Sequence, residues 1–93
     1  MLIGALSVKL YAPWVHSLKE KRMVVQSLLK KMRNKFNVSV AEVEDMDVHQ
    51  TITLGMACIS NNYAHADSMM NELISFIDSN TEAEIIDIIR EIR

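Results

Sequence analysis

Two stretches of the chain alternate large apolar residues with small or polar ones, and this alternation restricts the fold more than any other feature. The first covers residues 2–11 and is followed by Pro13; the second covers residues 51–60. A period of two is typical of a strand with one buried face, and proline ends such a strand. The alternating apolar positions are Leu2, Leu6, Val8 and Leu10, then Ile52, Leu54, Met56 and Cys58. We expect both stretches to be central strands of a sheet.

The segment between these strands, and the segment after the second, have helical spacing instead. Ser17 followed by Glu20 is a capping box, in which the hydroxyl accepts from a first-turn N–H and the carboxylate reaches back to the N–H of Ser17. Asn61 or Asn62 can cap the later helix. The apolar stripes are Leu18, Val25, Leu28, Leu29, Met32 and Phe36 in the first helix and Ala66, Met69, Met70, Leu73, Phe76 and Ile77 in the second.

Two further segments favour strands. After Asn37 the apolar positions change parity, from Val38 and Val40 to Ala41 and Val43, which indicates a bulge near Val40 or Ala41. The tail EAEIIDIIREIR fits either a helix face or a strand, and its five isoleucines favour the strand because β-branched side chains prefer extended backbone.

The resulting order is βαββαβ over one domain of residues 1–93. With right-handed crossovers this order folds most simply into a four-stranded antiparallel sheet with both helices on one face, the ferredoxin-like arrangement of the α+β class.

Composition points to a soluble protein of the cytoplasm. Cys58 is the single cysteine, so the chain has no internal disulfide and suits a reducing compartment. The apolar N-terminus contains Lys9 and lacks the features of a signal peptide, and no apolar run reaches the ~20 residues of a membrane helix. Charge is divided: residues 1–40 carry eight Lys/Arg and one acid, and residues 41–93 carry two Arg and eleven acids.

Three motifs resemble a known family. SLKEKR at residues 17–22, FNVSVAEV at 36–43 and LG at 54–55, at these spacings, are similar to the YlxP-like (DUF503) family of small bacterial proteins. The resemblance covers essentially the whole chain and implies a ferredoxin-like fold without established catalytic residues. Genes of the family often lie among those for translation and RNA-processing factors, so the resemblance also implies a connection with RNA or the ribosome.

The strongest functional candidate is a basic flank on the first helix, made of Lys19, Arg22, Lys30 and Arg33. At about 100° per residue these four cations fall on one side, outside the apolar stripe. They could contact RNA phosphates, or they could simply be the solvated side of a helix.

Lys21 and Glu42 form the second candidate. Lys21 falls inside the apolar stripe, and Glu42 lies two residues from Val40 on the same strand, so without a bulge it points toward the core. A buried carboxylate requires a partner. Three interpretations are open: an internal Lys21–Glu42 pair, a Lys21 whose head reaches water, or a polar site with a chemical role.

Nothing in the sequence predicts an active site, a metal or a cofactor. His16, His49 and His65 lack ligand spacing, Gly4 and Gly55 are isolated within strands, and no nucleophile motif is present.

The open face of the predicted sheet lacks the aromatic side chains on which RNA-recognition modules of this fold stack bases. It is small and partly apolar, with Ile3, Ala5, Thr53, Ala57 and Ile89, which favours homodimerisation through this face.

Two hypotheses follow: a nonenzymatic factor that binds ribosomal RNA or the ribosome through the basic flank, or a protein-interaction module without a nucleic-acid role. Added salt should weaken the first kind of binding steeply and the second little.

Overall fold

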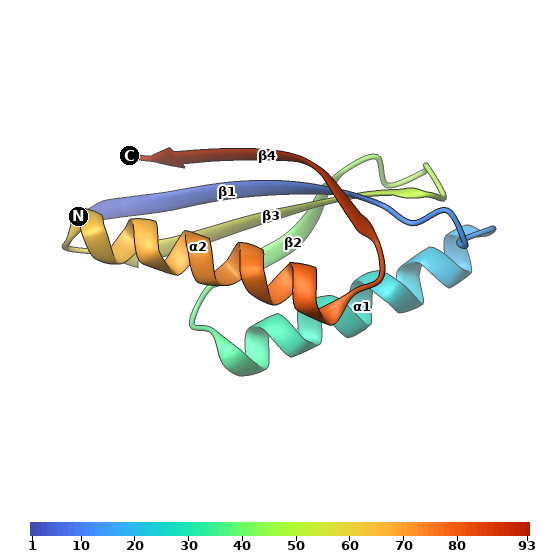
Figure 1. Cartoon of the computed structure of the whole chain (residues 1–93), viewed down its shortest axis with the longest axis horizontal. Coiled ribbons are helices and arrows are strands. Elements are labelled where there is room, and N and C mark those ends of the chain that lie inside the picture. The colour runs from blue at the N-terminus through green and yellow to red at the C-terminus, as the bar shows by residue number, and fades with distance from the viewer.

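All 93 residues are described in a computed structural model, which has six elements in the predicted order (Figure 1). They are β1 (Leu2–Tyr11), α1 (Leu18–Lys35), β2 (Ser39–Glu44), β3 (Thr51–Ser60), α2 (Tyr63–Asn80) and β4 (Glu84–Ile92). The tail is a strand, as its isoleucines indicated. The ferredoxin-like α+β fold is therefore confirmed.

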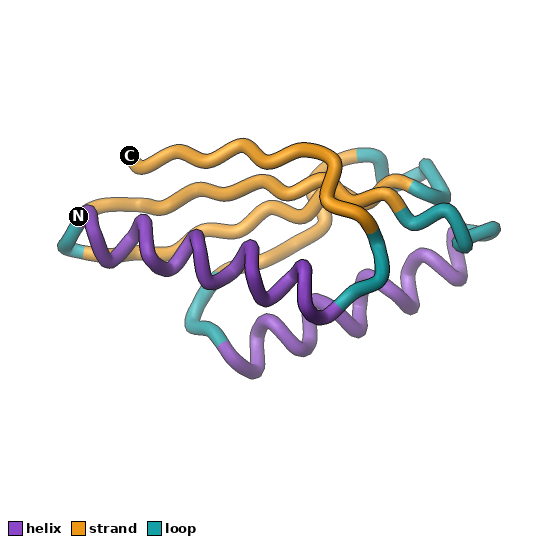
Figure 2. Tube along the Cα trace, in the orientation of Figure 1, coloured by secondary structure: helices purple, strands orange, loops and turns teal.

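The four strands form one antiparallel sheet in the order β2-β3-β1-β4. The two alternating strands are central, as predicted, and both helices lie on the same side of the sheet (Figure 2). Neither α1 nor α2 has an apolar run of the kind that crossing a bilayer needs.

The core lies between the sheet and the two helices. The apolar positions of the alternating strands face the helices, where Val8, Leu10, Ile52 and Leu54 are fully buried. The opposite positions of β1 and β3 point to the open face. A period of two therefore decides which face of the sheet is covered.

Both helices begin at the predicted caps. Ser17 Oγ accepts a hydrogen bond from the N–H of Glu20 at 3.1 Å, and the side chain of Asn62 caps α2. One detail of the capping box was wrong: the Glu20 carboxylate accepts from the N–H of His16 at 3.0 Å, one residue beyond Ser17. The hydrogen bond between His16 and Glu20 closes the turn that leads into α1.

The predicted bulge position in β2 was also wrong. Pairing with β3 is regular through Glu42, and the register shifts between Glu42 and Glu44. Val43 is the extra residue, and its side chain lies over Gly55, where an added Cβ would come within 2.7 Å of Val43 Cγ1. Val40 and Glu42 therefore share the helix-facing side, and the apolar Val43 belongs to the open face.

Candidate functional site

The basic flank lies along the outer side of α1. Lys19, Arg22 and Lys30 are exposed, and none of the three forms an ion pair with an acidic side chain. They span twelve residues of helix, about 16 Å along its axis. We call Lys19, Arg22 and Lys30 the unpaired row.

Arg33 differs from the other three cations of the flank. Its Nη2 donates to the backbone carbonyl oxygen of Val40 at 3.0 Å. This contact ties the C-terminal half of α1 to β2 and shows that the basic flank faces the β2 side of the sheet. Arg33 therefore already has a structural partner.

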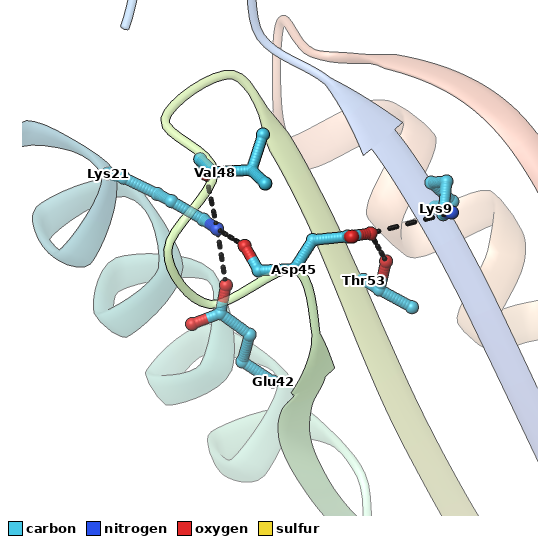
Figure 3. Close-up of polar contacts among 6 residues, drawn as sticks. All are labelled: Lys9, Lys21, Glu42, Asp45, Val48 and Thr53. Carbon is cyan, nitrogen blue, oxygen red and sulfur yellow. Dashed lines mark hydrogen bonds and ion pairs between the residues drawn. The ribbon is translucent and has the colours of Figure 1, made fainter. Parts of the chain in front are cut away.

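Lys21 and Glu42 come together below the connection between β2 and β3 (Figure 3). Lys21 Nζ lies 2.9 Å from Glu42 Oε2, and it donates to the backbone carbonyl oxygens of Asp45 at 2.6 Å and Val48 at 2.7 Å. The Lys21 side chain is only 2% exposed, and that of Glu42 is 19% exposed. Glu42 Oε2 is itself buried, and the ammonium is its only polar partner.

These contacts give the pair a role in folding. The ammonium of Lys21 donates to two backbone carbonyl oxygens and lies against the Glu42 carboxylate, so groups of the protein itself already surround it. The cation inside the apolar stripe of α1 thus fixes that helix to the turn after β2.

Asp45 links the two sides of the sheet, which the sequence analysis missed. Its backbone, at φ 57°, turns the chain, so its carbonyl oxygen faces Lys21 while its carboxylate crosses the open face (Figure 3). Oδ2 accepts from the hydroxyl of Thr53 at 3.2 Å and lies 3.4 Å from Lys9 Nζ. Aspartate is among the few residues that readily adopt a positive φ, which suits Asp45 to this turn.

A second feature that the sequence analysis missed is a groove where α1 ends beside α2. It encloses about 650 Å³ and is lined by Phe36 and Phe76, whose rings meet edge to face with centroids 5.3 Å apart. Lys35 Nζ lies 5.4 Å from the centre of the Phe76 ring and 5.9 Å from that of Phe36. The cation–π contacts place this lysine over the rings, away from the unpaired row.

The open face of the sheet contains a shallow hollow of about 250 Å³. Ala5, Ser7 and Gly55 line it, and Ile89 stands at its side. The exposed apolar residues of this face include Ile59 and Ile89, 69% and 62% exposed. Thr53, expected to contribute to this surface, is buried because Asp45 covers it.

Comparison with known proteins agrees with the resemblance carried by the three motifs. Residues 3–90 match the family described as "Protein of unknown function (DUF503)". Over 68 residues the chain is 38% identical to "Uncharacterized protein YlxP" of Bacillus subtilis (strain 168), an alignment that covers 73% of this chain and 74% of that protein. On this evidence the chain belongs to the YlxP-like DUF503 family.

Proposed function

We propose that this protein is a nonenzymatic RNA- or ribosome-associated factor, and that it contacts RNA phosphates through the unpaired row of α1. The observation that carries the proposal is the exposure of Lys19, Arg22 and Lys30 without acidic partners, on one side of a helix. A lysine or arginine that binds a phosphate releases a condensed counterion, and this release favours binding. A cation already paired with a carboxylate would have to give up that partner first.

The anchoring of α1 supports the same surface. Lys21 lies between Lys19 and Arg22 in the sequence but points inward to Glu42, and Arg33 holds the other half of the helix to β2. A helix fixed at both places presents its outer cations in a constant geometry. Less conformational entropy is then lost when they bind.

The sheet offers no comparable surface for RNA. Modules of this fold that read single-stranded RNA stack bases on aromatic side chains of the central strands. The corresponding open-face positions here include Ala5, Ser7, Gly55 and Ala57. Contact through phosphates therefore suits this chain better than contact through bases.

The proposal predicts a specific loss of RNA binding. Changing Lys19, Arg22 and Lys30 to Gln should weaken binding of the purified protein to small-subunit ribosomal RNA and to intact ribosomes by tenfold or more at low salt. It should also reduce the slope of log K against log salt by about 2 to 3, because each lost phosphate contact removes about 0.7–0.9 from the slope. Titrations at several salt concentrations measure both quantities.

A matched control separates this surface from total charge. Changing Lys31, Lys35 and Arg93 to Gln removes the same three charges from elsewhere, so both variants have a net charge of −5 instead of −2. The control should retain most of the affinity. Equal losses in the two variants would mean that only net charge matters, and no binding by the folded wild-type protein would refute the proposal.

A second function rests on the open face. The hollow beside Ile89, together with the exposed Ile59, suits a protein partner, because contiguous apolar surface usually marks an interface. As a protein-interaction module, the chain would bind its partner with an affinity that changes little as salt is added. The two functions are distinguished by measuring the affinity for a protein recovered from ribosome preparations over the same series of salt concentrations. Little change with salt would favour the protein-interaction function.

A further inference from the structure

The sheet has two free edges, and the first of them, on β2, is protected against pairing. β2 has six residues, and its register is broken between Glu42 and Glu44. The outward-pointing carbonyl oxygen of Val40 already accepts a hydrogen bond from Arg33. Short length, a bulge and a covering side chain are devices that keep an edge strand from pairing with another chain.

The other edge, on β4, has nine residues and no such cover. Ile3 and Arg93 exchange both of their backbone hydrogen bonds, at 2.8 and 2.9 Å. Because hydrogen-bonded and non-hydrogen-bonded pairs alternate in an antiparallel ladder, Ile88, Arg90 and Ile92 direct their backbone N–H and C=O groups away from β1. These groups lie along the free edge of β4, the uppermost strand in Figure 1.

The exposed side chains of β4 include three isoleucines as well as the charged Asp87 and Glu91. Ile86, Ile88 and Ile89 are 50%, 39% and 62% exposed. Arg90, which could guard the edge with its charge, instead turns to α2, where it donates to Asn71 Oδ1 at 2.7 Å and pairs with Asp67. The one irregularity of β4 falls at its beginning, opposite Lys9 and Leu10, so residues 87–92 pair regularly with β1.

We propose that a second copy of this chain pairs antiparallel along β4, so that two four-stranded sheets become one sheet of eight strands. A two-fold axis perpendicular to the sheet generates this pairing and makes the interface isologous. Both helix layers then lie on the same side of the joined sheet. The open face and the basic flank beside β2 remain uncovered, so this inference does not depend on the proposed function.

The side-chain pattern selects the register. With the axis at Ile88, that residue faces its own copy, and Asp87 faces Ile89 of the second copy. Moving the axis to Ile89 would oppose Asp87 to Glu91, and moving it to Arg90 would oppose two arginines. Like charges directly opposite one another destabilise a strand pair, so the register centred on Ile88 is favoured.

Disulfide trapping tests this geometry. Directly opposite residues in a hydrogen-bonded antiparallel pair have Cα atoms about 5.5 Å apart, within the range that a disulfide spans. Ile88→Cys should therefore give a covalent dimer under mild oxidation, while the native Cys58, which is buried, should not. Ile59→Cys, on the exposed open face, is the matched control and should stay monomeric on a denaturing gel.

Hydrogen exchange on the unmodified protein provides a second test that does not depend on the variants. The amides of Ile88, Arg90 and Ile92 should be protected and should lose protection on dilution, as the dimer dissociates. A protein that sediments as a monomer at high concentration would refute the inference. Crosslinking of Ile59→Cys without Ile88→Cys, with fast exchange along β4, would also refute it and would place the dimer on the open face.

Discussion

Replacing Lys21 by methionine is expected to lower the free energy of unfolding by about 3–5 kcal/mol, the usual cost of removing one partner from a buried ion pair. Methionine has nearly the length of lysine and fits an apolar stripe, so the loss comes from what it leaves behind. The buried Glu42 Oε2 loses its only polar partner, and the carbonyl oxygens of Asp45 and Val48 lose a donor. Equilibrium denaturation with urea measures the difference.

The double variant Lys21→Met with Glu42→Gln separates the charge from the other contacts. Gln cannot leave an uncompensated negative charge, so the double variant should be more stable than Lys21→Met alone. The stability losses of Lys21→Met and Glu42→Gln should not add, because residues in direct contact are coupled by about 0.5–3 kcal/mol. An unchanged denaturation midpoint for Lys21→Met would show that the ammonium is not needed at this site.

This buried pair also affects the proposed RNA surface. Lys21 anchors the first turns of α1, and Lys19 and Arg22 lie on either side of it in the sequence. The SLKEKR motif thus combines a cap at Ser17, an inward cation at Lys21 and outward cations for the unpaired row. A folded Lys21→Met variant should still carry the outward cations, so its RNA affinity should fall less than that of the unpaired-row variant.

The order of elements could be predicted because its signals are local. Alternation in β1 and β3 follows from burial on a single face, and the caps at Ser17 and Asn62 follow from the need to satisfy free N–H groups. The tail was ambiguous by spacing, and the β-branched composition decided it. None of these inferences required knowledge of contacts distant in the sequence.

The site was less predictable, because it depends on contacts between distant segments. An inward-pointing Glu42 needs a partner. That partner, Lys21, lies 21 positions earlier in the chain, so no local pattern reveals the contact. The parity change in β2 predicts a bulge before Glu42, whereas the extra residue is Val43, which covers Gly55 on the open face. Its apolar character suggested the core, and only the register shows otherwise.

The largest packing effect is expected at the centre of the sheet. Leu54 is fully buried on β3, where its backbone lies between Val8 of β1 and Glu42 of β2. Leu54→Ala should reduce the free energy of unfolding by about 2–5 kcal/mol, through lost burial and the cavity that remains. Thermal or urea unfolding followed by circular dichroism measures this loss.

Ile59 supplies the control for that substitution because it lies on the same strand but on the open face, 69% exposed. In the monomer, Ile59→Ala should change stability by no more than about 0.5 kcal/mol, as for most surface substitutions. A loss at Ile59 as large as that at Leu54 would mean that the open face is buried in solution, which would favour the protein-interaction function. Comparable unfolding midpoints for Ile59→Ala and the wild type would instead show that Ile59 is not buried against a partner in solution.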